Sequence, residues 1–336
     1  MRLEAFKAGE FDVSIENIAK AWARAYTGPH FTRNEIVKAR FPHQNPSGMQ
    51  GFAMNMRRPL FTDQRVRQAL GLAFDFEWAN PMLFYGEYTR SESYFSNSEL
   101  AASGSPTPAE IALLAPYRAQ LPATIWDEAT PAPIAGTPER LRANLLAAQA
   151  LLTAAGWQVR DGQLINAQGQ SFRFEFLAAS KVFERVIASY AHNLAKLGIT
   201  LTMRTVDPSL YQQRLDHFDY DMTTVFYPMS NSPGNEMLEY FASASALHAG
   251  SLNYVGLQDP VVDALLQHFV HYRSRAELVT ASRALDRVLR ARYLVVPNWF
   301  LANHRVAYWK HFNYPTTLPT YYAAEDWIIH TWWERQ

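Results

Sequence analysis

Residues 171–206 read SFRFEFLAASKVFERVIASYAHNLAKLGITLTMRTV, and this stretch decides the fold class. Alternating aromatic and polar side chains predict a strand over 171–177. The apolar spacing that follows predicts a helix over 181–196, with Ser180 as its N-cap. A second strand is predicted over 199–206. A strand, a helix and a strand in this order form a βαβ unit, which indicates an α/β fold.

The chain continues the alternation of strands and helices on both sides of this unit. Before it, GFAMNMRR predicts a strand over 51–58, and Asp63 is the expected N-cap of a helix over 64–74. The other predicted elements are a helix from Thr137-Pro138 to Gly156, a hairpin at Asp161-Gly162, a helix opening at Asp207-Pro208, a buried strand over 220–226, helices over 260–270 and 275–292, and a strand over 293–302 that Pro297 interrupts. The pattern predicts a sheet layered by helices.

One stretch departs from this alternation. Residues 101–138 carry seven prolines and many alanines. Such a composition predicts a long, irregular surface excursion with one short helix over 109–114. We expect most of it to lie outside the core.

Composition narrows the classes of function. The chain has 336 residues, of which 48% are hydrophobic and 18% are charged, and its 31 basic and 31 acidic residues give no net charge. Neutrality argues against nucleic acid as a partner. The absence of cysteine excludes disulfides, thiolate metal sites and a cysteine nucleophile. Aromatic residues make up 14% of the chain, which suits a cavity that holds an organic ligand.

Catalytic and cofactor motifs are missing from the sequence. It contains no GxxxxGK[ST], GxGxxG, GxSxG or HExxH pattern. His268 and His271 lie three apart on a predicted helix near Asp263, but no third ligand has a fixed spacing, so a solvated or interface pair is favoured over a metal site. We therefore predict no enzyme activity, no cofactor and no metal.

The loop after the buried strand over 220–226 is the first candidate site. Its sequence, YPMSNSPGN, has no charge and is followed by Glu236 at a predicted helix start. The hydrogen-bonding residues of the loop are Tyr227, Ser230, Asn231, Ser232 and Asn235. Loops at the carboxyl ends of strands in open α/β sheets are where ligands usually bind. The alternative interpretation is a simple turn at Ser232-Pro233-Gly234 with a helix cap.

Ser180-Lys181, with Arg185 one turn later, is the second candidate. A helix start with added cations can hold a carboxylate. An ordinary exposed helix N-terminus is the alternative, and the sequence favours it.

Four stretches in this order resemble the extracellular solute-binding proteins of peptide ABC importers, the oligopeptide and dipeptide family 5. They are FKAGEFDV at 6–13, GFAMNMRRPLFTDQRVRQALGLAFDFE at 51–77, TPERLRANLLAAQALLTAAGW at 137–157 and FYPMSNSPGNEM at 226–237. The last of them is similar to the YejA-type branch of that family.

The resemblance implies a type II periplasmic-binding-protein lobe, with a mixed sheet flanked by helices, and only the C-terminal half of such a protein. Residues 1–50 would be a remnant of the first lobe, 51–297 the second lobe, and 298–336 the return strand and closing segment. A peptide would bind between two lobes and pass to ABC permease subunits, so the missing first lobe is an expected partner. The implied location is the periplasm, although the charged N-terminus is no secretory signal. If Met1 is the true start, the chain would stay in the cytosol.

The resemblance also assigns binding residues. The segment over 226–236 matches the place where relatives contact the amino end and backbone of the peptide. Dipeptide binders have an aspartate there, whereas this chain has Ser230, Asn231 and Ser232, so Glu236 would have to supply the charge. Lys181 falls in the loop where dipeptide binders place a cation for the ligand carboxylate. The resemblance places Asn253 and Tyr254 along the cleft.

Two alternatives remain open at this point. The chain could be a hydrolase with a dispersed Ser/His/Asp site, which requires a serine within about 3 Å of a histidine. It could also be a fragment without a ligand of its own.

Overall fold

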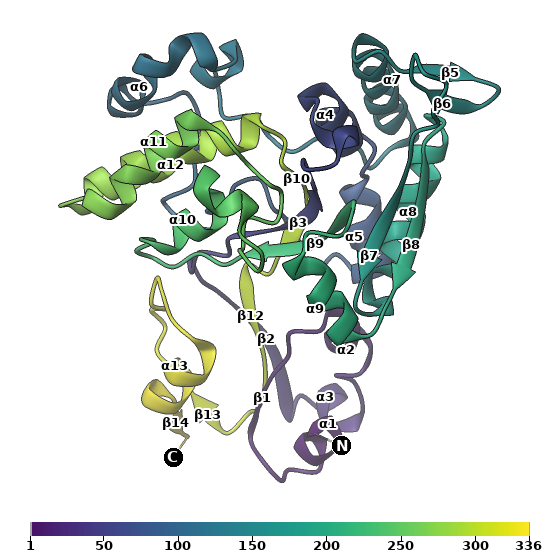
Figure 1. Ribbon diagram of the computed structural model, residues 1–336. Coiled ribbons are helices and arrows are strands. Elements are labelled where there is room, and N and C mark those ends of the chain that lie inside the picture. The colour runs from purple at the N-terminus through teal and green to yellow at the C-terminus, as the bar shows by residue number, and fades with distance from the viewer. Residues whose placement is uncertain (1, 336) are drawn as a thin grey trace. The chain divides into compact units, whose positions relative to one another are not determined.

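The computed structural model describes residues 2–335, which form two compact units (Figure 1). The smaller unit comprises Met1–Asn45, Asn80–Thr89 and Phe300–Gln336. The larger unit comprises Pro46–Ala79 and Arg90–Trp299. The chain therefore passes between the units after Asn45, Ala79, Thr89 and Trp299. The assignment of these units to a first and a second lobe stays a prediction.

A five-stranded mixed sheet forms the centre of the larger unit. Its strand order is β10 (Val295–Pro297), β3 (Met49–Met54), β9 (Met222–Tyr227), β7 (Arg173–Ala178) and β8 (Thr200–Thr205). The strand β7 is parallel to both β8 and β9, whereas β3 is antiparallel to β9 and β10. Between β7 and β8 the chain forms η4 (Lys181–Phe183) and α8 (Glu184–Ala195), so the predicted βαβ unit is confirmed.

Helices cover both faces of this sheet (Figure 1). On one face, Met49, Val225 and Val295 share a core with three helices, α10 (Glu236–Phe241), α11 (Pro260–His271) and α12 (Arg275–Ala291). On the other face, the ring of Phe52 lies 6.1 Å from that of Tyr190 on α8. A sheet buried on both faces explains why β3 reads as a nearly continuous apolar run.

Local capping sets the helix starts that the sequence predicts. Asp63 accepts a hydrogen bond from the backbone N–H of Arg65 at the start of α4 (Gln64–Leu72), and Thr137 accepts one from Arg140 at the start of α7 (Pro138–Ala154). The remaining elements of this unit are η1 (Pro59–Phe61), β5 (Gln158–Arg160), β6 (Gln163–Ile165), α9 (Pro208–Asp216) and η5 (Ser243–Leu247). Three short elements span a boundary between units: α5 (Phe76–Phe84), β4 (Thr89–Arg90) and β11 (Trp299–Phe300).

The proline-rich excursion is mostly exposed, as predicted, but it is anchored at a few points. It holds the predicted helix as α6 (Pro108–Leu114) and two further turns, η2 (Ala115–Gln120) and η3 (Ala123–Trp126). Glu110 on α6 forms an ion pair of 2.7 Å with Arg287 of α12, and both side chains are 2% exposed. Arg287 also donates hydrogen bonds to the carbonyls of Ser103 and Gly104. Arg290 of α12 also donates hydrogen bonds to the carbonyls of Ala102 and Thr130, so two guanidinium groups fasten the excursion to α12.

The smaller unit is built on a three-stranded antiparallel sheet. Its order is β1 (Val13–Ile15), β12 (Asn303–Trp309) and β2 (Ile36–Pro42). One apolar cluster contains Phe6 and Trp22, and another contains Phe41 and Trp327. The other elements are α1 (Arg2–Lys7), α2 (Ala19–Arg24), α3 (Pro29–Thr32), β13 (Phe312–Asn313), α13 (Ala324–Thr331) and β14 (Trp333–Glu334). No helix within residues 2–335 combines the length and apolarity needed to cross a lipid bilayer.

A histidine pair in the smaller unit predicts a pH-dependent stability. The rings of His43 and His304 lie 4.3 Å apart, and burial together with the second ring lowers the pKa of His43 to about 4. An unfolded histidine titrates near pH 6.5. Between these values the unfolded chain binds more protons, so we expect the free energy of unfolding to decrease as the pH falls from about 6.5 to about 4. Denaturant titrations at several pH values, followed by tryptophan fluorescence, measure this loss.

The matched variants are His43→Gln and His330→Gln, the latter at an exposed position on α13. The first should flatten the pH dependence and the second should leave it intact. An unchanged slope in the His43 variant would contradict the assignment.

Candidate functional site

Four parallel strands of the larger unit end at one edge of its sheet. The strands β7, β8, β9 and β10 run in the same direction, and antiparallel β3 begins at the edge where they end. We call this edge the carboxyl edge. The residues that follow the strands there include Lys181 after β7, the loop 228–236 after β9 and Asn298 after β10. Ligands of open α/β sheets bind at such edges.

The loop 228–236 lies where the first predicted site was expected. Gly48, with φ of +64°, sits beside its base, and a β-carbon there would lie 2.1 Å from the carbonyl oxygen of Tyr227. Only glycine allows β3 and the end of β9 to approach so closely. Within the loop, the Ser230 hydroxyl accepts a hydrogen bond from the N–H of Ser232. The guanidinium of Arg275 donates to the carbonyl of Asn231 and so fastens the loop to α12.

Several polar groups of this loop are open to a ligand. Ser230, Ser232 and Asn235 are exposed, and the buried Oδ1 atom of Asn231 has no hydrogen-bond partner. Glu236 is the first residue of α10 and half-buried, and its carboxylate forms no ion pair with any residue from 2 to 335. The structure thus brings these five predicted residues together in one segment.

The prediction that Tyr227 offers a hydrogen-bonding group to a ligand is not supported by its position. Its side chain is wholly buried, 5.0 Å from the ring of Phe241 and 6.0 Å from that of Tyr94. Burial raises its pKa well above the usual value, and its hydroxyl has no partner. On β9 the neighbouring side chain, Phe226, is the exposed one. Tyr227 therefore supports the loop from the core instead of contacting solvent.

Asn253 likewise disagrees with its predicted place along a cleft. It is wholly buried, its amide donates to the carbonyls of Ala242 and Leu257, and its oxygen accepts from the N–H of Leu257. The two bonds with Leu257 close a turn of the local backbone, and the bond to Ala242 ties this turn to the residue after α10. Tyr254 is half-buried, with its ring 6.1 Å from that of Tyr227, so it belongs to the edge of the same aromatic cluster.

Lys181 is exposed at the start of η4, as the second prediction required. Ser180 caps this turn by accepting a hydrogen bond from the N–H of Val182. The ammonium group has no ion-pair partner in the described part of the chain. Because β7 and β9 are adjacent and parallel, Lys181 and the loop 228–236 share the carboxyl edge.

Sequence reasoning missed a third group at this edge. Arg90 is 9% exposed, and Ser91 and Asn298 are not exposed at all. The N–H of Ser91 donates to the carbonyl of Asn298 over 3.1 Å, and the N–H of Asn298 continues the ladder to the carbonyl of Gln50. We call these three residues the buried polar group. A single arginine among serines and aromatic residues carries no motif, so only the coordinates reveal it.

Aromatic rings connect this group to the Lys181 turn. The guanidinium carbon of Arg90 lies 4.9 Å from the ring centre of Phe74 and 5.3 Å from that of Phe76. Phe76 stacks on Trp299 at 6.2 Å, and Trp299 lies 6.0 Å from Phe183, two residues after Lys181. The carboxyl edge therefore carries an aromatic platform between two cations.

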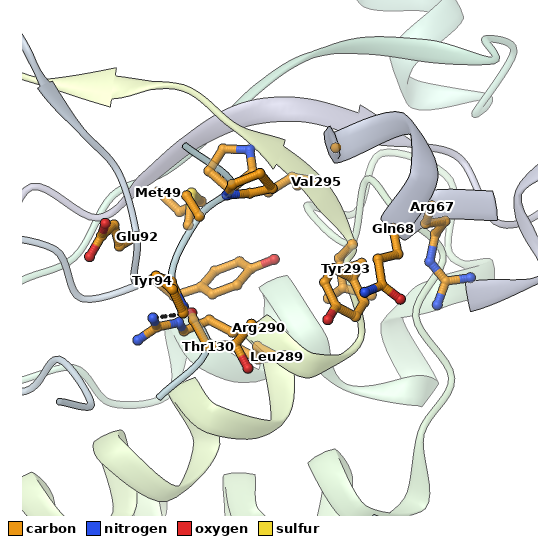
Figure 2. Close-up of a pocket in the computed structure, with 16 residues that line it drawn as sticks. Met49, Arg67, Gln68, Glu92, Tyr94, Thr130, Leu289, Arg290, Tyr293 and Val295 are labelled. Atoms are coloured by element: carbon orange, nitrogen blue, oxygen red, sulfur yellow. Dashed lines mark hydrogen bonds between the residues drawn. The ribbon is translucent and has the colours of Figure 1, made fainter. Parts of the chain in front are cut away.

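A separate pocket lies on the α12 side of the sheet (Figure 2). Figure 2 shows the ring of Tyr94 extending into it, with Tyr293 and Val295 on its wall. Its volume of about 50 Å³ holds only a few water molecules. A peptide does not fit there, so we place the candidate site at the carboxyl edge.

Catalytic and metal arrangements receive no support from the geometry. Within residues 2–335, no three His, Cys, Asp or Glu side chains are placed to hold a metal ion. His271 is bonded to the carbonyl of Gln267, and Asp263 accepts from the N–H of Ser243. No serine hydroxyl in the described part of the chain is hydrogen-bonded to a histidine ring, so no observation favours a hydrolase.

Solved structures define the fold class as a type II periplasmic-binding-protein lobe. The oligopeptide-binding protein AppA from Bacillus subtilis, solved with a nonapeptide, matches with a TM-score of 0.68 and 18% identity, over 100% of this chain and 58% of that one. NikA from Brucella suis, solved with Fe(III)-EDTA, matches with a TM-score of 0.62 and 18% identity, over 95% of this chain and 57% of that one. The predicted fold is confirmed.

Sequence comparison gives the family. The model of bacterial extracellular solute-binding proteins, family 5 Middle, matches residues 1–248, and this chain belongs to that family. The protein y4wM of Sinorhizobium fredii is 39% identical over all of this chain and 50% of its own length. The Probable peptide-binding protein YejA of Agrobacterium fabrum is 38% identical over 99% of this chain and 54% of its own. The chain thus spans about half the length of the curated relatives it matches.

Proposed function

We propose that this chain is the ligand-binding part of a peptide-uptake system. It captures a peptide or peptide-like compound in the periplasm and delivers it to the permease subunits of an ABC transporter in the membrane. The observation that carries the proposal is the polar loop 228–236 at the carboxyl edge, with the unpaired carboxylate of Glu236 at its end. Support comes from the family, from the name of the Agrobacterium relative and from the nonapeptide bound to AppA.

The residues of the edge suit the groups of a peptide. The carboxylate of Glu236 pairs with the free amine, because an ammonium ion has three hydrogen-bond donors and no acceptor. Ser230, Ser232 and Asn235 supply hydroxyls and an amide for peptide backbone groups, which need both donors and acceptors. The aromatic platform covers apolar side chains.

Calorimetric titration with a mixed pool of tri- to hexapeptides tests the proposal. The chain is measured alone and after co-expression with the half of the Agrobacterium relative that it does not match. We expect saturable binding and a rise in melting temperature with peptide. Binding only with the added half indicates that both halves form the site. No binding in either preparation, with both well folded, would refute the proposal and favour a fragment without a ligand.

Glu236 provides a sharper prediction. Glu236→Gln should weaken the binding of peptides with a free amine more than tenfold, because a neutral amide cannot balance the ammonium charge. The affinity for N-acetylated peptides should fall much less, because they carry no ammonium charge. Glu239→Gln is the matched control, since Glu239 is exposed on the same helix. Equal affinities for both peptide types in wild type and variant would remove Glu236 from the site.

A further inference from the structure

The outermost strand of the five-stranded sheet, β8, has an open edge. It pairs only with β7, and Figure 1 shows it at the rim of the sheet. The N–H of Thr200 bonds to the carbonyl of Phe172, so the even-numbered residues of β8 direct their backbone groups toward β7. The residues whose N–H and C=O groups point away from the sheet are Leu201, Met203 and Thr205. Within residues 2–335, these groups have no hydrogen-bond partner.

The opposite edge of the same sheet is protected, whereas β8 is not. The strand β10 there has only three residues and ends at Pro297, which has no N–H to offer. In contrast, β8 has six residues, no proline and a single charged side chain, Arg204. Proteins block the edges that stay free with short strands, prolines or several charges. The unblocked edge of β8 therefore indicates that another strand pairs with it.

A second copy of β8 fits this edge in an antiparallel orientation. A two-fold axis at Met203 sets that residue opposite its own counterpart, and Leu201 opposite Thr205 of the second copy. Each outward-facing residue then belongs to a hydrogen-bonded pair, and three pairs exchange two bonds each. The same surface serves both copies, as in the isologous interfaces of two-fold dimers.

Neighbouring registers use the edge less well. An axis at Arg204 would place two like charges directly opposite each other, which destabilises a strand pair. An axis at Thr202 would place Thr205 opposite Ile199, whose N–H already bonds to the carbonyl of Leu194. Only the register centred on Met203 avoids both faults.

The charges beside the edge also permit two copies to approach. On one face of the sheet, three guanidinium groups and three carboxylates form a single network of ion pairs. Its members are Arg58, Arg204, Arg214, Glu175, Asp219 and Asp221. The network has no net charge, so it does not repel the same network of a second copy.

We propose that two copies of this chain associate through β8, antiparallel and with Met203 on the two-fold axis, which joins their two sheets into one continuous sheet. The inference goes beyond the proposed function and does not depend on it. The loop 228–236 follows β9, which β7 separates from β8, so it lies outside the paired strands.

Sedimentation velocity of the full chain over a wide range of concentrations tests the association. We expect the mass of one chain at low concentration and of two chains at high concentration. Met203→Lys sets two ammonium groups opposite each other and should weaken the association about tenfold or more. Met203→Pro removes an outward N–H without breaking a bond to β7, and it should weaken the association as well. The matched control is Leu146→Lys on α7, where a 57% exposed side chain should tolerate lysine without effect.

The absence of cysteine from the chain allows a test of the register. Met203→Cys introduces one thiol, with its Cα about 5.5 Å from that of its counterpart, which is within reach of a disulfide. Thr200→Cys is the control on the same strand, because its counterpart would lie six residues further along, about 20 Å away. Mild oxidation should crosslink the first variant into a dimer and leave the second monomeric on a non-reducing gel.

Three outcomes would overturn the proposal. One is a wild-type chain that stays monomeric at every concentration. Another is association that persists unchanged in both Met203→Lys and Met203→Pro, which would assign the dimer to a different surface. The third is equal crosslinking of the two cysteine variants, since random collision would explain it without any fixed register.

Discussion

Replacing Glu110 by alanine is expected to lower the free energy of unfolding of the larger unit by about 3–5 kcal/mol. The reason is the charge that the variant leaves behind. Arg287 is buried in α12 and pairs with Glu110 over 2.7 Å. Without that carboxylate its guanidinium keeps only carbonyl partners, which balance no charge. Urea titration followed by circular dichroism measures the loss.

Two comparisons separate this effect from the removal of any ion pair. Glu99→Ala breaks the exposed pair with Arg275 and should cost no more than about 1 kcal/mol. Combining Glu110→Met with Arg287→Met removes both charges and should recover most of the stability. If Glu110→Ala proved as stable as wild type, the pair of Glu110 with Arg287 would not hold the proline-rich excursion.

Phe52→Ala is expected to lower the free energy of unfolding by a similar amount, about 3–5 kcal/mol. The reason is the cavity that it opens in a closely packed aromatic layer. Phe52 lies in the middle of β3 and is wholly buried. Its ring lies 5.2 Å from that of Phe176 and 5.5 Å from that of Phe74. Neither neighbour can fill the space without leaving its own contacts.

The matched control is Phe226→Ala on the adjacent strand β9. Phe226 is 52% exposed, so its loss should change stability by no more than about 1 kcal/mol. Thermal unfolding of both variants gives the comparison. Equal decreases in melting temperature for the two variants would show that burial on this face does not determine stability.

Local features of the fold could be read from the sequence. Asp63 and Thr137 cap their helices as predicted, because a cap depends on four or five neighbouring residues. The position of β3 between β9 and β10 could not be read, since it depends on pairing between segments far apart in the chain. The ion pair of Glu110 with Arg287 escaped prediction for the same reason.

The location of the candidate site could be predicted from the sequence, but the residues that form it could be predicted only in part. A polar loop after a buried strand marks the carboxyl edge, and the structure places Glu236 and Lys181 there. Tyr227 proved to be buried because a sheet covered on both faces gives no alternation that separates inside from outside. Asn253 proved to be buried because its amide bonds the backbone of Ala242 and Leu257, which lie apart from it in the sequence. Arg90 was missed because the rings it packs against, Phe74 and Phe76, carry no pattern that links them to an arginine.

The strand order of the smaller unit has a consequence for how this chain is made. β12 lies between β1 and β2, which do not pair with each other, and the sequence of the larger unit separates it from both. On the ribosome, β1 and β2 emerge before the larger unit and lack their central partner until β12 is synthesised. Nascent chains therefore expose two unpaired strands while the larger unit is translated, and such strands are prone to aggregation. Release of an incomplete chain before β12 leaves this sheet without its central strand.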